Sequence, residues 1–126
     1  MRCARRRPAA PDDPDTRTLA GIAASPGTAE GVARVATNIA EGRELRAGEI
    51  LVARFTDPGW TPIFPLASGL VTEIGGMLSH GAIVSREFGL PAVVNVRDVA
   101  SKVRTGDRIR VDGDTGEVEI LQASSE

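Results

Sequence analysis

The 126-residue chain has few of the side chains that metal sites, disulfides and stacked bases require. A single cysteine, Cys3, excludes an intrachain disulfide. One cysteine and one histidine cannot supply the three or four ligands of a structural zinc site. There is no tyrosine, and the four aromatic residues are Phe55, Phe64, Phe88 and Trp60. This scarcity argues against base stacking on single-stranded nucleic acid, and it leaves the core to Val, Ile, Leu and Ala.

The charge balance and the lack of long apolar runs exclude further classes of protein. Lys and Arg number 15 against 17 Asp and Glu, so the chain lacks the positive excess of a polyanion binder. No apolar run has the length of a membrane span, and no apolar segment follows the basic N-terminal residues as a secretory signal requires. The hydrophobic fraction of 41% is ordinary for a globular domain. We expect a cytoplasmic protein that binds neither nucleic acid nor membrane.

Composition divides the chain into two parts. Residues 1–17 combine arginines, prolines and aspartates with almost nothing apolar, which predicts a disordered tail or linker. A solvated tail is a simpler interpretation of its arginines than a nucleic-acid or membrane contact. Residues 18–126 are expected to form one domain, which would bury about 60–65% of its unfolded surface.

Short runs of β-branched and apolar residues dominate this domain. They predict strands at 19–24, 31–37, 49–55, 70–74, 91–96, 107–111 and 117–121. The last two flank residues 112–116, a glycine-containing loop that indicates a hairpin and is too short for an EF-hand. A helical piece at 59–67 is weakly indicated, because Pro62 and Pro65 lie within it.

One segment has helical periodicity instead. A spacing of i, i+4, i+7 and i+11, typical of one apolar helix face, is shared by Met77, Gly81, Val84 and Phe88. Gly89 stands where a helix stops, and Pro91 follows at the usual distance. Ser79 is a suitable N-cap, so the helix should begin at Ser79 or His80.

The start of this helix is the most informative place in the chain. A strand and the pair Gly75-Gly76 precede it, and His80, the single histidine, opens it. Free backbone N–H groups and the positive helix end favour an anion there, phosphate above all. A neutral imidazole beside it could accept a phosphoryl group. A structural histidine and a tight structural turn remain alternatives, since the glycine pair lacks the Lys-Ser/Thr ending of a P-loop.

Residues 73–94, EIGGMLSHGAIVSREFGLPAVV, resemble the phosphohistidine segment of the phosphoenolpyruvate-utilising enzymes. These include phosphoenolpyruvate synthase, pyruvate phosphate dikinase and the rifampin phosphotransferases. Residues 56–62, TDPGWTP, are similar to the segment that precedes this motif in the synthase and rifampin branches. Residues 23–31 look like the usual opening of the domain, so the resemblance covers roughly residues 19–121.

The resemblance implies an α/β fold, a swivelling β/β/α domain that is β-rich with one main helix starting near His80. It implies that His80 is transiently phosphorylated and shuttles the phosphoryl group between two sites on partner domains. One partner is an ATP-grasp nucleotide-binding domain or subunit with an ATP or phosphoenolpyruvate site, and the other carries the acceptor site. Mg²⁺ and ATP or phosphoenolpyruvate would bind to those partners, and this domain would bind no cofactor or metal itself.

The resemblance also assigns neighbours of His80. Phosphate-binding positions are Gly75, Gly76, Ser79 and Gly81, and the Ser79 hydroxyl could donate to a phosphate oxygen. Glu73 would either orient the imidazole or be a solvated strand end. Arg86 and Glu87 match the family's R-E pair, where structural partners on the helix surface are favoured over a direct phosphate role. Trp60 is expected to pack rather than to bind substrate.

Three residues depart from the family pattern. Leu78, Gly81 and Asn95 stand where other branches usually have Thr or Ser, Ala, and Gly. These departures leave the acceptor open. Nothing in the chain resembles an ATP-grasp domain, so the partners would act in trans or lie upstream. The alternative is a non-catalytic remnant of the fold that serves as an interaction or regulatory module.

Overall fold

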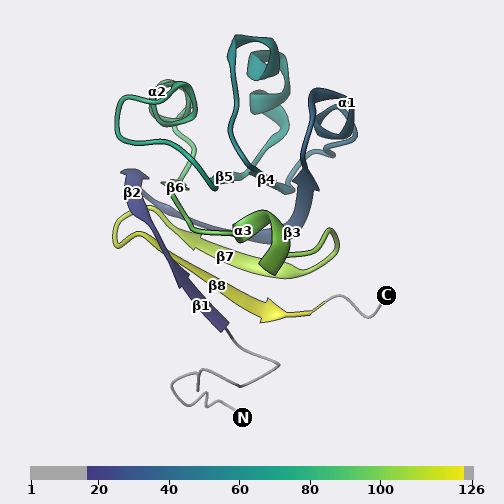
Figure 1. Ribbon diagram of the computed structural model, residues 1–126, viewed down its shortest axis with the longest axis vertical. Helices are drawn as coiled ribbons and strands as arrows, with labels where there is room; N and C mark the ends of the chain where they lie inside the picture. The colour runs from purple at the N-terminus through teal and green to yellow at the C-terminus, as the bar shows by residue number, and fades with distance from the viewer. Residues whose placement is uncertain (1–16, 124–126) are drawn as a thin grey trace.

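The computed structural model describes residues 17–123. The predicted tail lies outside the described residues, except for Arg17, which begins the first strand. The domain has three layers: the antiparallel part of one sheet, the mostly parallel part of the same sheet, and a set of short helices (Figure 1). This is the expected α/β class with a β/β/α arrangement.

Eight strands form one continuous sheet in the order β1-β8-β7-β3-β4-β5-β6-β2. Strands β1, β8, β7 and β3 pair antiparallel, β3 to β6 pair parallel, and β2 closes the far edge antiparallel to β6. The bounds are β1 (Arg17–Ala20), β2 (Ile22–Ser25), β3 (Thr28–Ala36), β4 (Ile50–Ala53), β5 (Gly69–Thr72), β6 (Ala92–Val94), β7 (Arg108–Asp112) and β8 (Glu117–Gln122).

Each predicted strand is present, but residues 19–24 form parts of two strands rather than one. The chain leaves the antiparallel part at Gly21 and enters the parallel part as β2. A Cβ at Gly21 would lie 2.4 Å from the Val94 carbonyl oxygen, and the Gly21 N–H donates to the Gly116 carbonyl at 2.8 Å. The crossing requires glycine because two backbones meet there, a contact that the local strand pattern does not reveal.

Four helical segments accompany the sheet: α1 (Ile39–Gly42), the 3₁₀ helix η1 (Pro58–Leu66), α2 (His80–Phe88) and α3 (Val99–Lys102). The weakly indicated piece at 59–67 is real and takes the 3₁₀ form. The Asp57 carboxylate accepts from the Gly59 N–H at 2.9 Å, and Pro58 occupies the first turn, where it needs no amide. Two four-residue helices, α1 and α3, were not predicted, because they are too short for a periodic signal.

The predicted main helix is confirmed at both ends. Helix α2 begins at His80, and Ser79 is its N-cap. It ends at Gly89, whose φ of 70° is the left-handed conformation that glycine adopts without strain. Figure 1 shows that a long loop leads from β5 to the start of this helix.

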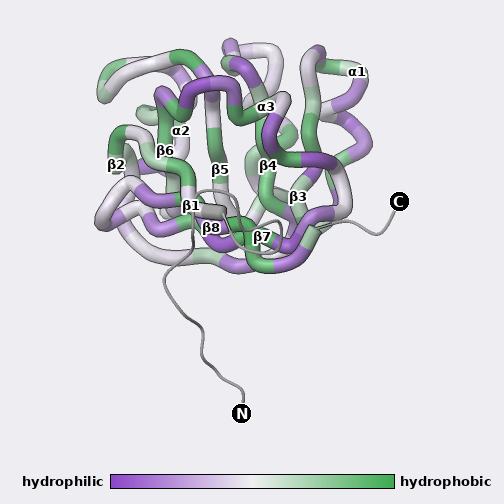
Figure 2. Tube along the Cα trace, turned by 60° about the horizontal axis from the view of Figure 1, so that its bottom comes forward, coloured by the Kyte–Doolittle hydropathy of each residue, from purple (hydrophilic) through white to green (hydrophobic). Residues whose placement is uncertain are grey.

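The parallel strands are buried on both faces, which explains their continuous apolar runs. In β4, Leu51 and Ala53 join a core under the helices, whereas Ile50 and Val52 join a second core against the antiparallel part. The hydropathy colouring shows the hydrophobic course of β4 and β5 through the middle of the domain (Figure 2). The loops at the carboxyl ends of the parallel strands therefore start from a part of the sheet that is buried on both faces.

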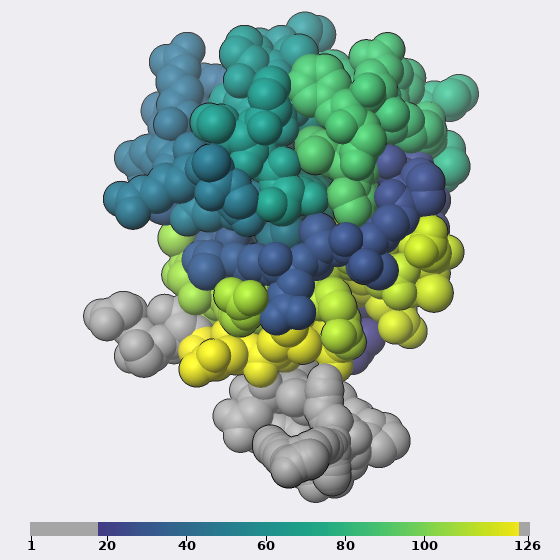
Figure 3. Space-filling model, turned by 180° about the vertical axis from the view of Figure 1, so that it is seen from behind, coloured from purple at the N-terminus to yellow at the C-terminus, as the bar shows by residue number. Residues whose placement is uncertain are grey.

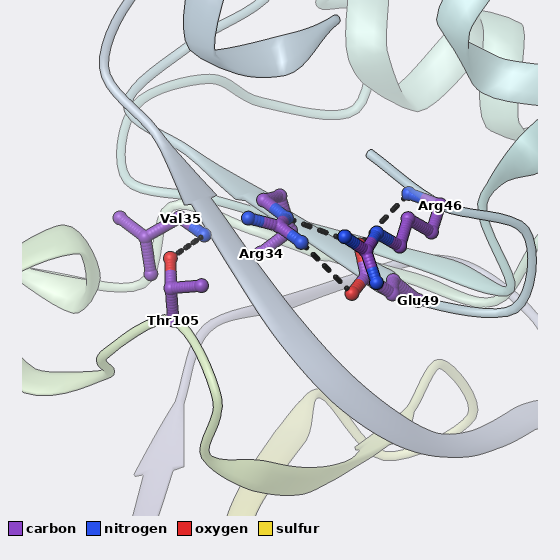
Figure 4. A network of polar contacts seen from close by, with 5 residues as sticks. All are labelled: Arg34, Val35, Arg46, Glu49 and Thr105. Carbon is purple, nitrogen blue, oxygen red and sulfur yellow. Dashed lines mark hydrogen bonds and ion pairs between the residues drawn. The ribbon is translucent and has the colours of Figure 1, made fainter. Parts of the chain in front are cut away.

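Strand β3 links the two parts of the sheet. Seen from behind, it lies between the helical half and β7 and β8 (Figure 3). Arg34 in β3 forms a two-pronged ion pair with Glu49, with Nε–Oε1 and Nη2–Oε2 distances of 3.1 and 3.2 Å. Glu49 also accepts from the Arg46 N–H, and the Thr105 hydroxyl accepts from the Val35 N–H (Figure 4). These contacts fix β3 to the loops before β4 and β7.

Candidate functional site

His80 lies at the junction of α2 with the loop that follows β5. Its side chain is half-buried. The imidazole has one hydroxyl near each ring nitrogen: Thr56 Oγ1 lies 2.9 Å from Nδ1, and Thr61 Oγ1 lies 3.3 Å from Nε2. The ring also meets Phe64 edge-to-face, with centroids 5.9 Å apart. The ring is thus held from three sides.

The two threonines come from the segment between β4 and the middle of η1. Thr56 is buried, only 9% exposed, whereas Thr61 is half-buried on η1. Both lie in the segment 56–62 that resembles the family, but the sequence predicts a role for neither. Only the resemblance pointed to these two residues. Nothing in the spacing shows that Thr61 and Thr56, which lie 19 and 24 positions before His80, contact its ring.

The glycine loop is shaped by Ser79 as well as by its glycines. Gly75 has a φ of +135°, and a Cβ there would lie 3.0 Å from Ser79 Oγ. A Cβ at Gly76 would meet nothing within 4 Å. The Ser79 hydroxyl donates to the Gly76 carbonyl at 2.7 Å and accepts from the Ala82 N–H at 3.4 Å. Its hydrogen is therefore already committed to the loop.

Backbone donors gather around this loop. In the part of the chain that the structure describes, the N–H groups of residues 75–78 donate to no backbone carbonyl. The first amides of α2 add the positive end of a nine-residue helix. Below them, the hydroxyl of Thr72 is buried and has no hydrogen-bond partner, and it lies 3.9 Å from the Cβ position of Gly75. These donors can bind an anion at the start of the helix.

Gly81 allows the helix to approach the sheet closely. A Cβ at this position would lie 3.0 Å from Leu70 Cδ2 and 3.2 Å from Thr56 Oγ1. The absence of a side chain thus leaves room for the Thr56 hydroxyl that contacts the His80 ring. Gly81 shapes the histidine site from below, and it is buried.

The structure places the remaining predicted residues around the loop. Glu73 forms an ion pair with Arg54, with 3.1 Å between Oε1 and Nε. The hydrogen-bonding contacts of the His80 ring come from the two threonines and not from Glu73. Arg86 donates to two backbone carbonyls, and Glu87 is exposed on α2. Trp60 is 5% exposed and packs over Gly42, where a Cβ would meet its ring at 2.8 Å.

Within residues 17–123, no group of three or more His, Cys, Asp or Glu side chains is arranged to hold a metal ion. None of the helices in the same range has the length and apolar character of a membrane span.

The fold, with His80 at the start of its main helix, is that of a β/β/α mobile domain. Residues 45–116, more than half of the chain, match the family model of the PEP-utilising enzyme mobile domain. The chain belongs to this family of mobile domains from phosphoenolpyruvate-utilising enzymes.

Relatives of this chain are much longer proteins. A rifampicin phosphotransferase from Streptomyces sviceus is 52% identical over 110 residues, which are 87% of this chain and 13% of that protein. The prodigiosin synthesizing transferase PigC of Serratia marcescens is 53% identical over 103 residues, 81% of this chain and 12% of that one. Phosphoenolpyruvate synthase from Aeropyrum pernix is 44% identical over 99 residues, which are 78% of this chain and 12% of that protein. The chain spans about an eighth of the length of these relatives.

Solved structures share the fold. The solution structure of Enzyme I matches with a TM-score of 0.54 and 35% identity over 61% of this chain and 32% of that one. Aconitase X from Thermococcus kodakaraensis matches with a TM-score of 0.66 and 25% identity, covering 84% of this chain and 99% of that chain. The same β/β/α scaffold therefore occurs in proteins with different names, so function has to be inferred from the histidine site rather than from the fold.

Proposed function

We propose that this domain is a phosphoryl carrier and that His80 is transiently phosphorylated on Nε2. The observation that carries the proposal is the 2.9 Å contact between His80 Nδ1 and the buried Thr56 hydroxyl, at the start of α2. A hydrogen on Nδ1 that is donated to Thr56 leaves the lone pair of the neutral ring on Nε2. In that tautomer, with Thr56 accepting from Nδ1, Nε2 is the nucleophilic nitrogen.

The transfer step needs no further group on this domain. The Nε2 lone pair forms the new N–P bond as the P–O bond to the leaving group breaks, and the leaving oxygen keeps that electron pair. Charge on the three equatorial phosphoryl oxygens is stabilised by the α2 N-terminus and the amides of residues 75–78. The Thr61 hydroxyl, 3.3 Å from Nε2, must move aside as the bond forms.

The donor and the acceptor belong to other domains in this proposal. An ATP-grasp domain or subunit would present ATP, or another domain phosphoenolpyruvate, with the Mg²⁺ that neutralises its phosphates. A third domain would present the acceptor. The support is that, in much longer relatives, the matched part makes up only 13% and 12% of the protein. Gly75, Gly76, Ser79 and Gly81 would shape the phosphate site, with Ser79 acting mainly through the loop geometry that it fixes.

The test is phosphorylation in trans. The chain is incubated with ATP, Mg²⁺ and a rifampicin phosphotransferase whose own mobile-domain histidine has been replaced, and its intact mass is measured at alkaline pH. We expect one added phosphoryl group, lost after acid treatment, because phosphohistidine is acid-labile. His80→Ala should remain unlabelled. Since the chain has one histidine, this variant also separates phosphohistidine from acid-labile phosphorylation of arginine or Lys102.

A second arm removes the dependence on a foreign donor enzyme. Phosphoramidate alone can phosphorylate an accessible imidazole, with ammonia as the leaving group. Labelling of the parent by both donors, absent in His80→Ala, supports the carrier. An unlabelled parent with phosphoramidate would overturn the proposal and favour a non-catalytic interaction module of the same fold.

A further inference from the structure

The loop between β5 and α2 has little side-chain packing of its own. Its apolar residues point outward: Ile74 is 52% exposed, Met77 46% and Leu78 85%. The N–H groups of Glu73 and Ile74 are tied to backbone carbonyls at the beginning of the loop, and Ser79 ties the Gly76 carbonyl near its end. Between these two points, the N–H groups around Met77 donate to no backbone carbonyl, so another contact must hold this part of the loop in place.

Arg86 supplies that attachment. Side chains on a helix lean toward its N-terminus, so a residue in the last turn of α2 can reach back to the loop that precedes the helix. Arg86 Nη2 donates to the Met77 carbonyl at 2.6 Å, and its Nε donates to the Ala24 carbonyl at 2.8 Å. The Met77 sulfur lies 3.7 Å from the same Nη2. One guanidinium thus joins the loop to β2.

The anchor is firmer than the loop. Ala24 is 4% exposed and belongs to β2, which is hydrogen-bonded along β6. The guanidinium is planar and presents its donors at fixed angles, so a loop carbonyl bonded to Nη2 is placed relative to a strand carbonyl bonded to Nε. An ammonium could bond to either carbonyl but could not impose their relative placement.

We propose that Arg86 is a positioning residue, which holds the Gly75–Leu78 loop in the geometry that its amides need to bind the phosphoryl group on His80. The inference deepens the proposed carrier function and rests on it. Arg86 does not touch the phosphate in this arrangement. It acts through the Met77 carbonyl, so its loss should leave the histidine ring and its two threonines in place while the amides beside them become mobile.

Preorganised donors matter because they stabilise transition-state charge without having to be reoriented. A loop that samples several conformations presents those amides correctly only part of the time. We therefore expect slower phosphorylation and faster hydrolysis of the phosphohistidine in variants without the guanidinium. Both effects should occur in a protein that is still folded, since the Arg86 side chain is exposed and its replacement leaves no cavity in the core.

The experiment compares Arg86→Met, Arg86→Lys and the matched control Arg97→Met, whose arginine is exposed on the loop after β6. Each full chain is phosphorylated with phosphoramidate: Nε2 attacks phosphorus, the P–N bond of the donor breaks, and ammonia leaves with a proton from water. We expect Arg86→Met to be labelled on the order of tenfold more slowly than the parent, with Arg86→Lys intermediate and Arg97→Met unchanged. The half-life of the phosphohistidine should shorten in the same order.

A second readout is independent of phosphorylation. Backbone ¹⁵N order parameters should fall at residues 76–78 in Arg86→Met, while those of α2 and β5 stay at the parent's values. Unchanged order in the loop, or an unchanged labelling rate, would overturn the inference. If the parent itself is not labelled, the carrier proposal fails and the catalytic part of the inference fails with it. The order parameters then decide separately whether Arg86 fixes the loop.

Discussion

Thr56 Oγ1 lies 2.9 Å from Nδ1 of His80, although the two residues are 24 positions apart. Thr56 follows β4, which lies in the buried parallel part of the sheet. His80 begins α2, which follows the loop after β5. The sheet therefore orients the imidazole of a residue that the helix carries. For the proposed carrier function, this arrangement lets the ring keep one orientation when a phosphoryl donor approaches.

Thr56→Val should slow phosphorylation of His80 by roughly fivefold to tenfold, which corresponds to the loss of about one hydrogen bond of 1–1.4 kcal/mol. Valine retains the shape of threonine but forms no hydrogen bond with Nδ1, so the ring loses the contact that orients it. The measurement is the rate of acid-labile labelling with phosphoramidate, followed by intact mass.

Thr115→Val is the matched control, because Thr115 is exposed in the β7–β8 turn. It should be labelled at the rate of the parent. A Thr56→Val variant that is labelled as fast as the parent would show that the Nδ1 contact does not orient the ring for the reaction.

Gly75→Ala and Gly76→Ala should behave differently despite being neighbours. Gly75 has a φ of +135°, and its added methyl would press on Ser79 Oγ at 3.0 Å, so we expect a cost of about 1–3 kcal/mol and displacement of the helix cap. A methyl at Gly76 meets nothing within 4 Å. Urea unfolding measures the stability difference, and labelling of His80 should be impaired in the first variant only. Equal effects in both variants would contradict this account of the loop.

The sequence contained enough local information for the helix at the site and for the strands. Ser79, His80 and Gly89 lie at the boundaries that capping rules predict, because those rules depend on neighbours within a few residues. The strands were recognisable from the same kind of local pattern. The division of residues 19–24 at Gly21 was not, because it depends on the Val94 and Gly116 backbones far along the chain.

The site itself was only partly predictable. The position of His80 at the helix start followed from the motif, but its two ring contacts come from Thr56, just before η1, and Thr61, within η1. Glu73 was a reasonable candidate for orienting the ring, yet Arg54 at the end of β4 occupies its carboxylate. Tertiary partners of this kind compete for each polar group, and a single sequence gives no measure of which partner is closer.

The carboxylate of Glu41 should contribute a small pH dependence to stability. The Thr37 N–H donates to Glu41 Oε1 at 2.7 Å, and the Thr37 hydroxyl does so at 2.9 Å. These bonds favour the charged form and lower the pKa of Glu41 from its ordinary 4.5, the backbone bond first. Because the folded pKa is depressed, the stabilisation is present above the ordinary value and is lost as pH falls through the folded one.

Glu41→Gln should therefore reduce the dependence of the thermal midpoint on pH in the acidic range and leave its slope near pH 7 unchanged. Thr37→Val removes the hydroxyl and keeps the stronger backbone bond, so the pKa of Glu41 should rise only part of the way back. An NMR titration of the side chain measures this. A parent whose Glu41 titrates at the ordinary value would contradict the prediction.

Gly113→Ala should be among the most damaging changes in the chain, although the residue lies in a turn far along the sequence from His80. Its Cβ would lie 1.8 Å from the Ser25 carbonyl oxygen, and its N–H donates to the Gly27 carbonyl at 2.7 Å. The backbone of β2 would have to move, so we expect a loss of more than about 3 kcal/mol in urea unfolding.

Ser25 adjoins Ala24, the carbonyl anchor of Arg86, so the folded fraction of this variant should also show altered order in the loop beside His80. Thr115→Ala in the same turn is exposed and should unfold like the parent. A Gly113→Ala variant with the parent's stability would mean that the turn can move away from β2 without cost.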